Sequence, residues 1–384
     1  MPDAITFFPW VATDGPITVG PVRLLPYKRG MSPGDQPNVS QSSIDAVLAA
    51  YAERKDHLVP EATLMEIGDW RSGQEVNDQV RAQLFRTREF VAFAALAKRR
   101  LFRGHFDYCN FDTYAFVIQN YSAGDVGGFS FSTRRRDGGL NYVWDAEEFA
   151  FLKPLHVASN AKMSLDLLLL DALLRADDQD RVPFESIVEF GRANTDSADV
   201  PIHTELVMVK SAFEFLFGIG TDVNEFVSAL TAVLPSSGTH DGPMAVRWVS
   251  ARPKAARPLE AWAREFCDLR GGAAHGRKRG GDRFVWSEHA HLAFAAILFP
   301  LVVKHQLSQD GYLVIEQRDA IEFEWIEAYL MHDPFDPAPE GRRRQPYEHP
   351  WSRIYSDGVL GEVLRRRIAG SIDSIGKRDP SAIQ

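Results

Sequence analysis

The sequence predicts an α+β protein in which a mostly β N-terminal domain precedes an all-α helical bundle. Two observations lead to this fold class. Up to about residue 155, short apolar runs are separated by turn-forming residues. Beyond that point, apolar residues recur at the three- and four-residue spacing of helices with one buried face. We therefore expect a mostly β domain at 1–155 that serves recognition or regulation, a helical bundle at 156–310, and a C-terminal appendage with a basic tail at 311–384.

Strands are expected wherever β-branched and aromatic residues lie between turn signals. The first 34 residues fit short strands, because Asp14-Gly15 and Gly20-Pro21 interrupt their apolar runs. Apolar spacing predicts a helix at Ser43–Arg54, whereas Glu89–Leu96 fits either a strand or a helix. Further strands are expected at Tyr108–Asn120, at Gly127–Thr133 and, as the hairpin partner of the latter, at Asn141–Trp144.

The second half has the pattern of a helical bundle. Helices are predicted at Ser164–Arg175 with Ser164 as N-cap, Phe184–Arg192, His203–Phe217, Val223–Leu234, Leu259–Leu269 and Ser287–Leu307. Pro235–Pro258, which contains Trp248, is interpreted as a polar connection. Past Asp310 we expect a strand-like YLVIE run, a helix at Ala320–Leu330 and a linker at 332–351.

Composition is that of an ordinary soluble protein, with 45% apolar and 25% charged residues. The formal net charge of −9 does not indicate a nucleic-acid-binding protein, so any RNA contact must come from local basic patches. Two cysteines, Cys109 and Cys267, form neither a disulfide framework nor a metal-ligand spacing. No secretory signal is visible, and the longest apolar run, Leu292–Val303, is shorter than a bilayer span. We expect a cytoplasmic protein with no membrane partner.

The stretch with the most chemical content is WAREFCDLRGGAAHG, from Trp262 to Gly276. It carries Arg270 and, five positions later, His275. Arginine stays charged and matches phosphate geometry, and histidine has an unperturbed pKa near neutrality. An arginine followed by a histidine after four to six residues is not specific by itself, because the pattern recurs at Arg100/His105, Arg283/His289 and Arg344/His349. Only the Arg270 pair follows an apolar helix, precedes another and is followed at once by a glycine.

The segment FCDLRGGAAHG resembles the motif of the HEPN superfamily, in the ApeA-like branch, where an apolar-x-Asp-Leu-Arg run leads into R-x(4–6)-H and ends in His-Gly. SAFEFLFGI, Ser211–Ile219, is similar to the "ALExL" helix of that branch, and the resemblance covers roughly Leu155–Gln309. It implies an α-helical bundle that dimerises and joins two motifs into one ribonuclease site. It also implies a role in prokaryotic antiviral defence or toxin-like RNA restriction. The residue after the arginine is commonly polar in these families, whereas here it is Gly271, followed by Gly272.

The resemblance implies a metal-independent endoribonuclease that needs no cofactor. A ribose 2′-OH would attack the adjacent phosphate, with His275 as base and acid and Arg270 stabilising the charge that builds up. Glu214 matches the acid of the "ALE" helix and would orient Arg270. The loop that follows the motif would hold the RNA backbone through Arg277, Lys278, Arg279 and Arg283.

Structural alternatives exist for each of these residues. Arg270 and His275 are also the charges that a helix C-terminus favours, the basic loop could simply be solvated, and Glu214 could belong to a structural ion pair. Cys267 is interpreted as a small buried apolar residue, and His289, His291 and His305 are expected to be structural. The alternative function is a catalytically inactive HEPN-like nucleotide- or protein-binding module that acts as a sensor or regulator.

Overall fold

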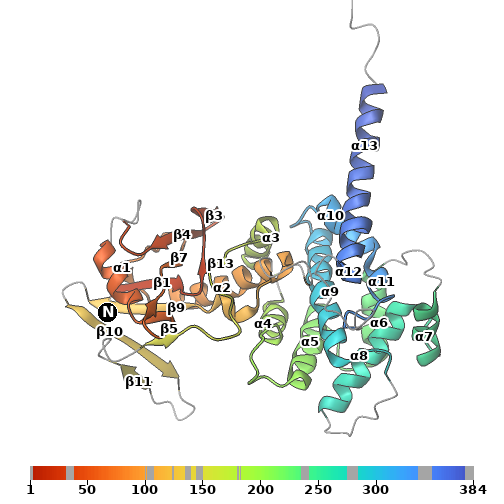
Figure 1. Cartoon of the computed structure of the whole chain (residues 1–384), viewed down its shortest axis with the longest axis horizontal. Helices are drawn as coiled ribbons and strands as arrows, with labels where there is room; N and C mark the ends of the chain where they lie inside the picture. The colour runs from red at the N-terminus through yellow and green to blue at the C-terminus, as the bar shows by residue number, and fades with distance from the viewer. Residues whose placement is uncertain are drawn as a thin grey trace, which may run out of the picture. The chain divides into compact units, whose positions relative to one another are not determined.

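The computed structural model describes residues 3–31, 39–99, 101, 108–122, 125–134, 140–143, 150–179, 181, 183–234, 242–274, 284–335 and 348–376. Two compact units make up the chain (Figure 1). Unit 1 comprises Met1–Arg99, Cys109–Val182 and Asn194–Val200, and unit 2 comprises Arg100–Tyr108, Pro183–Ala193 and Pro201–Gln384. A strand-rich N-terminal region followed by a helical region confirms the α+β class. The division differs from the expected boundaries, because unit 1 extends past residue 155 and residues 311–384 belong to unit 2.

An antiparallel sheet forms the centre of unit 1. Its strand order is β11-β10-β9-β1-β7-β4-β3. The eighth strand, β8, pairs with β1 and is not part of this order. The strands are β1 Asp3–Phe8, β3 Ile17–Val19, β4 Val22–Lys28, β7 Glu61–Ile67, β8 Gln74–Glu75, β9 Val117–Ser122, β10 Asp125–Arg134 and β11 Leu140–Val143. Nearly every residue of β1 and β7 is buried, so these central strands are covered on both faces.

Two helices cover the sheet. The apolar residues of α1, Gln41–Leu48, pack in one core with Ile5, Phe7 and Leu64 of the central strands. The longer α2, Asp78–Lys98, packs against β7 and against the 3₁₀ helix η2, Phe111–Tyr114. The Tyr114 ring of η2 lies 6.2 Å from the Phe8 ring of β1.

Short strands complete unit 1 at its periphery. β5 Tyr51–Arg54, β6 His57–Leu58 and β12 Phe151–Leu152 form a small sheet in the order β12-β5-β6. β2 Val11–Ala12 pairs in parallel with β13 Ala161–Lys162. The helix α3, Leu167–Asp177, also belongs to unit 1 and packs on α2.

Several predictions for unit 1 are confirmed and three are wrong. The early strands and the β10–β11 hairpin are present, and Glu89–Leu96 lies within α2. The helix expected to reach Arg54 ends at Leu48, because the chain then pairs as β5. The strand expected from Tyr108 begins only at Val117, because Asn110 and Thr113 form a capping box that starts η2. The N-cap of α3 is Asp166, which accepts a hydrogen bond from the Leu169 N–H at 3.0 Å, and not Ser164.

Unit 2 is helical throughout its described part (Figure 1). Its helices are α4 Phe184–Ala193, α5 Ile202–Phe217, α6 Val223–Val233, α7 Pro243–Ala251, α8 Pro258–Ala274, α9 Glu288–Gln309, α10 Gln317–Glu324, α11 Ile326–Tyr329, α12 Pro350–Arg353 and α13 Gly361–Gly376, with a π-helix at Ile354–Leu360 between the last two. The helices expected from apolar spacing between Phe184 and Leu307 are thus all present.

The core of unit 2 is built around α9. The Phe299 ring of α9 stacks on Phe190 of α4 at 4.4 Å and meets Phe213 of α5 edge-on at 5.0 Å. This helix is long and apolar enough to cross a membrane, yet 72% of its most apolar window is buried within the protein. It is the buried helix that the run Leu292–Val303 predicts.

Three predictions for unit 2 need correction. The supposed connection Pro235–Pro258 contains α7, whose Trp248 is fully buried and donates a hydrogen bond to the Leu330 carbonyl at 3.0 Å. The YLVIE run, Tyr312–Glu316, forms no strand. Among the described residues, no strand lies beside it to pair with its backbone. The expected C-terminal helix is divided into α10 and α11 at Trp325.

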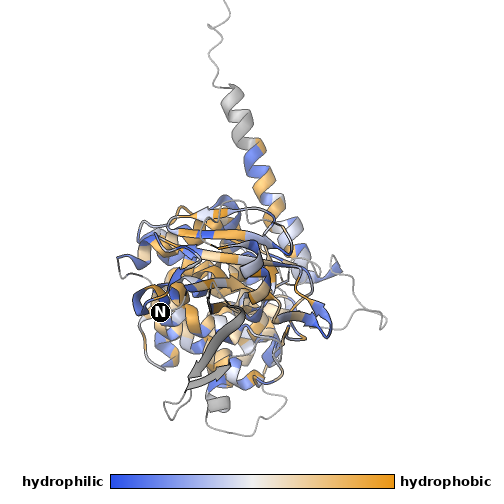
Figure 2. Cartoon of the chain, turned by 90° about the vertical axis from the view of Figure 1, so that its left-hand side faces the viewer, coloured by the Kyte–Doolittle hydropathy of each residue, from blue (hydrophilic) through white to orange (hydrophobic). Residues whose placement is uncertain are grey.

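The C-terminal region packs into unit 2 as far as it is described. Trp351 of α12 is 1% exposed, and its ring lies 6.1 Å from Trp286 and 6.4 Å from Phe294. Beyond it, α13 carries both hydrophilic and hydrophobic residues (Figure 2), with Leu364 and Ile368 exposed. The expected linker at 332–351 lies partly outside the described residues.

Candidate functional site

Helix α8 carries the motif arginine at its C-terminal end. Its buried face, formed by Trp262, Phe266 and Leu269 among others, holds the helix in the core of unit 2. Arg270 follows Leu269 and is half-buried. The helix continues through Gly271 and Gly272 to Ala274, and a Cβ atom added at either glycine meets no described atom within 4 Å. No described residue therefore packs against either glycine at this position.

The remaining motif residues lie outside the described part of the chain. His275, Arg277, Lys278, Arg279 and Arg283 all fall within 275–283. The described chain ends at Ala274, one residue before His275, and resumes at Phe284.

A buried carboxylate in the middle of α8 binds the chain where it resumes. Glu265 is 0% exposed, and its Oε1 atom accepts hydrogen bonds from the backbone N–H groups of Val285 at 2.8 Å and Trp286 at 3.0 Å. Ala274, the last residue of α8, and Val285 and Trp286, which are hydrogen-bonded to Glu265 of the same helix, are thus the described residues on the two sides of 275–283.

An arginine from the preceding helix lies against this carboxylate. Nη2 of Arg252, the residue that ends α7, lies 3.4 Å from Oε2 of Glu265 and 3.3 Å from Oδ2 of Asp268. The Arg252 guanidinium also lies 5.8 Å from the centre of the Phe284 ring. Because a buried carboxylate is strongly disfavoured without partners, this cation and the two amides explain how Glu265 is tolerated in the core.

His291 of α9 completes the buried group. Its Nε2–H donates to Oε1 of Glu265 at 3.1 Å, and the aromatic rings of Trp248, Trp262, Phe266 and Trp286 surround it. Burial lowers the pKa of His291, with the Glu265 carboxylate opposing this effect. The ring is therefore a neutral hydrogen-bond donor in the core, which is the structural role expected for it.

The acid expected to support Arg270 has another partner. Glu214 of α5 accepts a hydrogen bond from Nζ of Lys210 at 2.8 Å, one helical turn away. Lys210 is almost completely buried, and its ammonium lies 4.4 Å from the centre of the Phe226 ring. Among the described contacts, none joins Glu214 to Arg270. The structure thus places Glu214 in an ion pair, the alternative that the sequence left open.

The charges of that pair and of Arg270 all act on one thiol, that of Cys267 on α8. Lys210, Glu214 and Arg270 all influence the pKa of the Cys267 thiol, which burial raises to about 12. Cys267 is therefore a protonated, buried thiol, in agreement with its interpretation as an apolar residue. Arg270 has no salt bridge or hydrogen bond to any described residue, and its Nε atom is buried without a partner there.

Of the other histidines singled out in the sequence, His349, His289 and His305 lie in the described part of the chain. His349 is buried and serves as the N-cap of α12: its Nε2 donates to the Pro334 carbonyl at 2.7 Å, and its Nδ1 accepts from the Trp351 N–H at 3.2 Å. His289 is exposed on α9, and His305 stacks on the Phe323 ring at 5.0 Å. In the described residues, no three histidine, cysteine or acidic side chains are grouped so that they could hold a metal ion.

The sequence analysis missed Glu265 and Arg252. A signal for Glu265 was present, since it lies three residues after Trp262 and four before Leu269, on the apolar face of α8. An acid on such a face must have buried partners. Arg252 had no such signal, because α7 itself was not predicted. Comparison of the chain with protein-family models, with curated proteins and with solved structures finds no match in any of the three.

Proposed function

We propose that unit 2 is a HEPN-like, metal-independent endoribonuclease whose reacting groups are Arg270 and His275. The observation that carries the proposal is that the described chain on both sides of 275–283 belongs to α8 or is hydrogen-bonded to it. Arg270 lies four residues before the end of α8, and Glu265 of that helix binds the Val285 and Trp286 amides. His275 and the four basic residues lie in sequence between these two points.

The state of Arg270 supports a role in binding an anion. Buried or half-buried guanidinium groups are normally paired, because an unsatisfied buried donor costs free energy. Arg270 has no acidic partner among the described residues. Glu214, the acid expected to orient it, is paired with Lys210, and Asp268 of the same helix lies against Arg252. An RNA phosphate would supply the missing acceptor.

The reaction that these groups can perform is transesterification. The ribose 2′-oxygen forms a bond to phosphorus while the bond from phosphorus to the 5′-oxygen breaks. One His275 takes the 2′ proton and a second His275, from another copy of the chain, protonates the leaving 5′-oxygen. Arg270 stabilises the charge on the non-bridging oxygens, and the products are a 2′,3′-cyclic phosphate and a 5′-hydroxyl. A homodimer is part of this proposal, as are antiviral defence and toxin-like RNA restriction as its biological setting.

The proposal is tested by RNA cleavage with purified full-length protein in the presence of EDTA. We expect wild type to cleave RNA to fragments with 2′,3′-cyclic phosphate ends, and His275→Ala and Arg270→Ala to lose at least about 100-fold in rate. Arg270→Lys should recover only part of the rate, because lysine lacks the planar fork.

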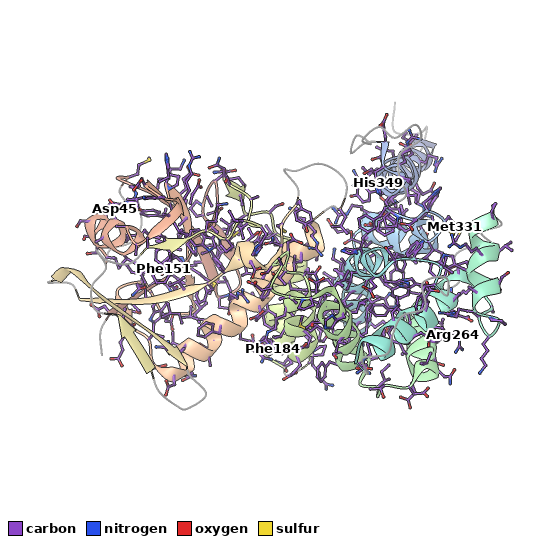
Figure 3. The ribbon with its side chains drawn as sticks, turned by 60° about the horizontal axis from the view of Figure 1, so that its bottom comes forward. Asp45, Phe151, Phe184, Arg264, Met331 and His349 are labelled. Atoms are coloured by element: carbon purple, nitrogen blue, oxygen red, sulfur yellow. The ribbon has the colours of Figure 1, made fainter. Side chains whose placement is uncertain are left out.

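Matched controls come from α8, which carries Arg270, and from α9, the next helix along the chain. Arg264 of α8, labelled in Figure 3, contacts Asn224 of α6, and His289 is exposed on α9. Arg264→Ala and His289→Ala should cleave RNA at the wild-type rate. Equal loss in these controls and in the motif variants, with all of them folded, would contradict the proposal. RNA binding without cleavage by wild type would favour the inactive binding module.

A further inference from the structure

Unit 1 contains a pocket that the ribonuclease chemistry does not use. Its volume is about 540 Å³, which lies within the range of small-molecule sites. Five aromatic residues from separate segments of the unit line it: Trp10, Tyr51, Phe85, Phe116 and Phe151. Phe151 of β12 is labelled in Figure 3.

The aromatic rings that line the pocket form two groups, here called its aromatic walls. In the first the Tyr51 ring stacks on Phe151 at 5.0 Å with an interplanar angle of 24°, and Trp10 lies 6.0 Å from Tyr51. In the second Phe85 of α2 meets Phe116 edge-on at 6.0 Å. Phe85 remains 47% exposed, so part of a large apolar ring has no protein cover. Walls of this kind suit a flat ring that stacks between aromatic faces.

The charged side chain that lines the pocket is positive. Arg81 is the charged residue among the described lining residues, which include neither Asp nor Glu. It lies four residues before Phe85, on the same face of α2. No salt bridge joins Arg81 to an acid in the described part of the chain, in a protein whose net charge is −9. A half-exposed guanidinium in this position suits an anionic group at the pocket mouth.

The pocket also has polar groups that match the edge of a base. Gln119 of β9 is fully buried and lines the pocket together with Asn120. The Tyr51 hydroxyl donates to Oε1 of Gln119 at 3.4 Å, and burial raises the pKa of Tyr51, so this hydroxyl keeps its proton. Nε2 of Gln119 donates to the Asn120 carbonyl at 3.3 Å, so Gln119 is held within the protein. The carboxamide of the half-buried Asn120 offers both donor and acceptor, which a hydrocarbon chain cannot use but a heterocyclic base can.

We propose that this pocket binds a mononucleotide, with the base between the aromatic walls and the phosphate on Arg81. The site is separate from the ribonuclease motif and does not depend on it. The same anion requirement would be met by an aliphatic carboxylate, and the test below includes one.

The test is isothermal titration of full-length protein with AMP, adenosine, ribose 5-phosphate and octanoate. We expect AMP to bind more tightly than any of the other three. Arg81→Ala should weaken AMP by about 10- to 100-fold and leave adenosine nearly unchanged, because only the phosphate contact is lost. Phe85→Ala should weaken AMP and adenosine alike, by about tenfold, because stacking acts on the base.

Two controls make the result specific to this pocket. Arg175→Ala removes an arginine of unit 1 that pairs with Asp171 on the surface of α3, and it should bind AMP as wild type does. Arg270→Ala should also retain AMP binding. Phe85 is exposed enough that its replacement leaves the fold intact, which circular dichroism verifies.

Three outcomes would overturn the proposal. The first is no AMP binding at about 1 mM ligand, a concentration at which even a weak specific site fills. The second is AMP binding that Arg270→Ala abolishes and Arg81→Ala does not, which would place the nucleotide in unit 2. The third is octanoate binding more tightly than AMP in an Arg81-dependent way, which would make the pocket a site for aliphatic anions.

Discussion

Glu265 and His291 are joined by a hydrogen bond of 3.1 Å, and both side chains are 0% exposed. They lie on α8 and α9, the two helices on either side of segment 275–283. The same carboxylate oxygen binds the Val285 and Trp286 amides, so one buried group fixes the start of α9 relative to α8. Its removal should therefore affect the stability of unit 2.

Glu265→Gln should lower the free energy of unfolding by about 2–4 kcal/mol, because two amides and an imidazole lose a charged acceptor in the core. Asp268→Asn is the matched control on the same helix. Asp268 also lies near Arg252, but its side chain is 57% exposed, so its change should cost less than about 1 kcal/mol. Urea denaturation measures both. Equal effects of the two substitutions would argue against a central role for Glu265.

The stability of the protein should fall on acidification through His291. Burial lowers its pKa below the ordinary 6.5, so below pH 6.5 the unfolded chain binds a proton that the folded chain does not. This contribution is complete above pH 6.5 and decreases at lower pH, with a slope of up to about 1.4 kcal/mol per pH unit. The charged groups that act on the ring are Glu265, Arg252 and Asp333.

Urea titrations at several pH values between 4.5 and 7.5 test this slope. His291→Gln should show a shallower dependence than wild type, whatever its absolute stability. His289→Gln, at an exposed position of the same helix, should keep the wild-type slope. A wild-type slope retained in His291→Gln would show that other groups cause the acid sensitivity.

Gly358→Ala should destabilise the C-terminal part of unit 2. A Cβ atom at Gly358 would lie 2.8 Å from two ring carbons of Trp325, so the π-helix at Ile354–Leu360 approaches the indole as closely as a glycine allows. Overpacking of this kind costs about 1–3 kcal/mol. Gly361→Ala, three residues later and with nothing within 4 Å, should be neutral or slightly stabilising.

Trp325→Phe in the Gly358→Ala background should restore part of the loss, because it removes the ring atoms that would clash. A double-mutant cycle on thermal unfolding measures the coupling. Additive effects of the two changes would mean that Gly358→Ala acts through the backbone and not through Trp325.

Gly271→Ala and Gly272→Ala should each stabilise α8 by up to about 1 kcal/mol, because alanine favours the helix and the added Cβ meets no described atom. Calorimetry of the full-length protein measures the gain. A loss of stability at either position would reveal a packing partner at this surface. If stability rises while RNA cleavage falls, the glycines leave room for the substrate or for a second copy of the chain.

Local patterns predicted the helices of the bundle well, because each buries a continuous apolar face. Trp262, Phe266 and Leu269 of α8 are an example. Short elements with few buried residues were missed. Helix α7 buries only Ala245 and Trp248 and lies in a Pro/Gly-rich stretch, so it has little periodic signal. The YLVIE run has strand-forming residues but no strand beside it, and strand formation depends on such a partner.

Only part of the candidate site could be predicted from the sequence, because local patterns do not show which distant segments come into contact. The apolar helix that precedes Arg270 follows from sequence spacing, and the structure contains it as α8. The contact of Glu265 with His291 and Arg252 joins three helices, and no local pattern encodes which buried charges meet. The partner of Glu214 could have been anticipated, because Lys210 precedes it by four residues on one helix.

The chain passes between the two units five times, after residues 99, 108, 182, 193 and 200. Helix α4 belongs to unit 2, yet the segments on both sides of it, up to Val182 and from Asn194, belong to unit 1. No single cut therefore separates the units as independent pieces. A cut near residue 155 would divide unit 1, and a cut near residue 200 would leave 201–384 without α4, whose Phe190 stacks on Phe299 in the core of unit 2. Joining two separate genes end to end would not produce this connectivity, because the sequence of unit 2 is interrupted twice by segments of unit 1.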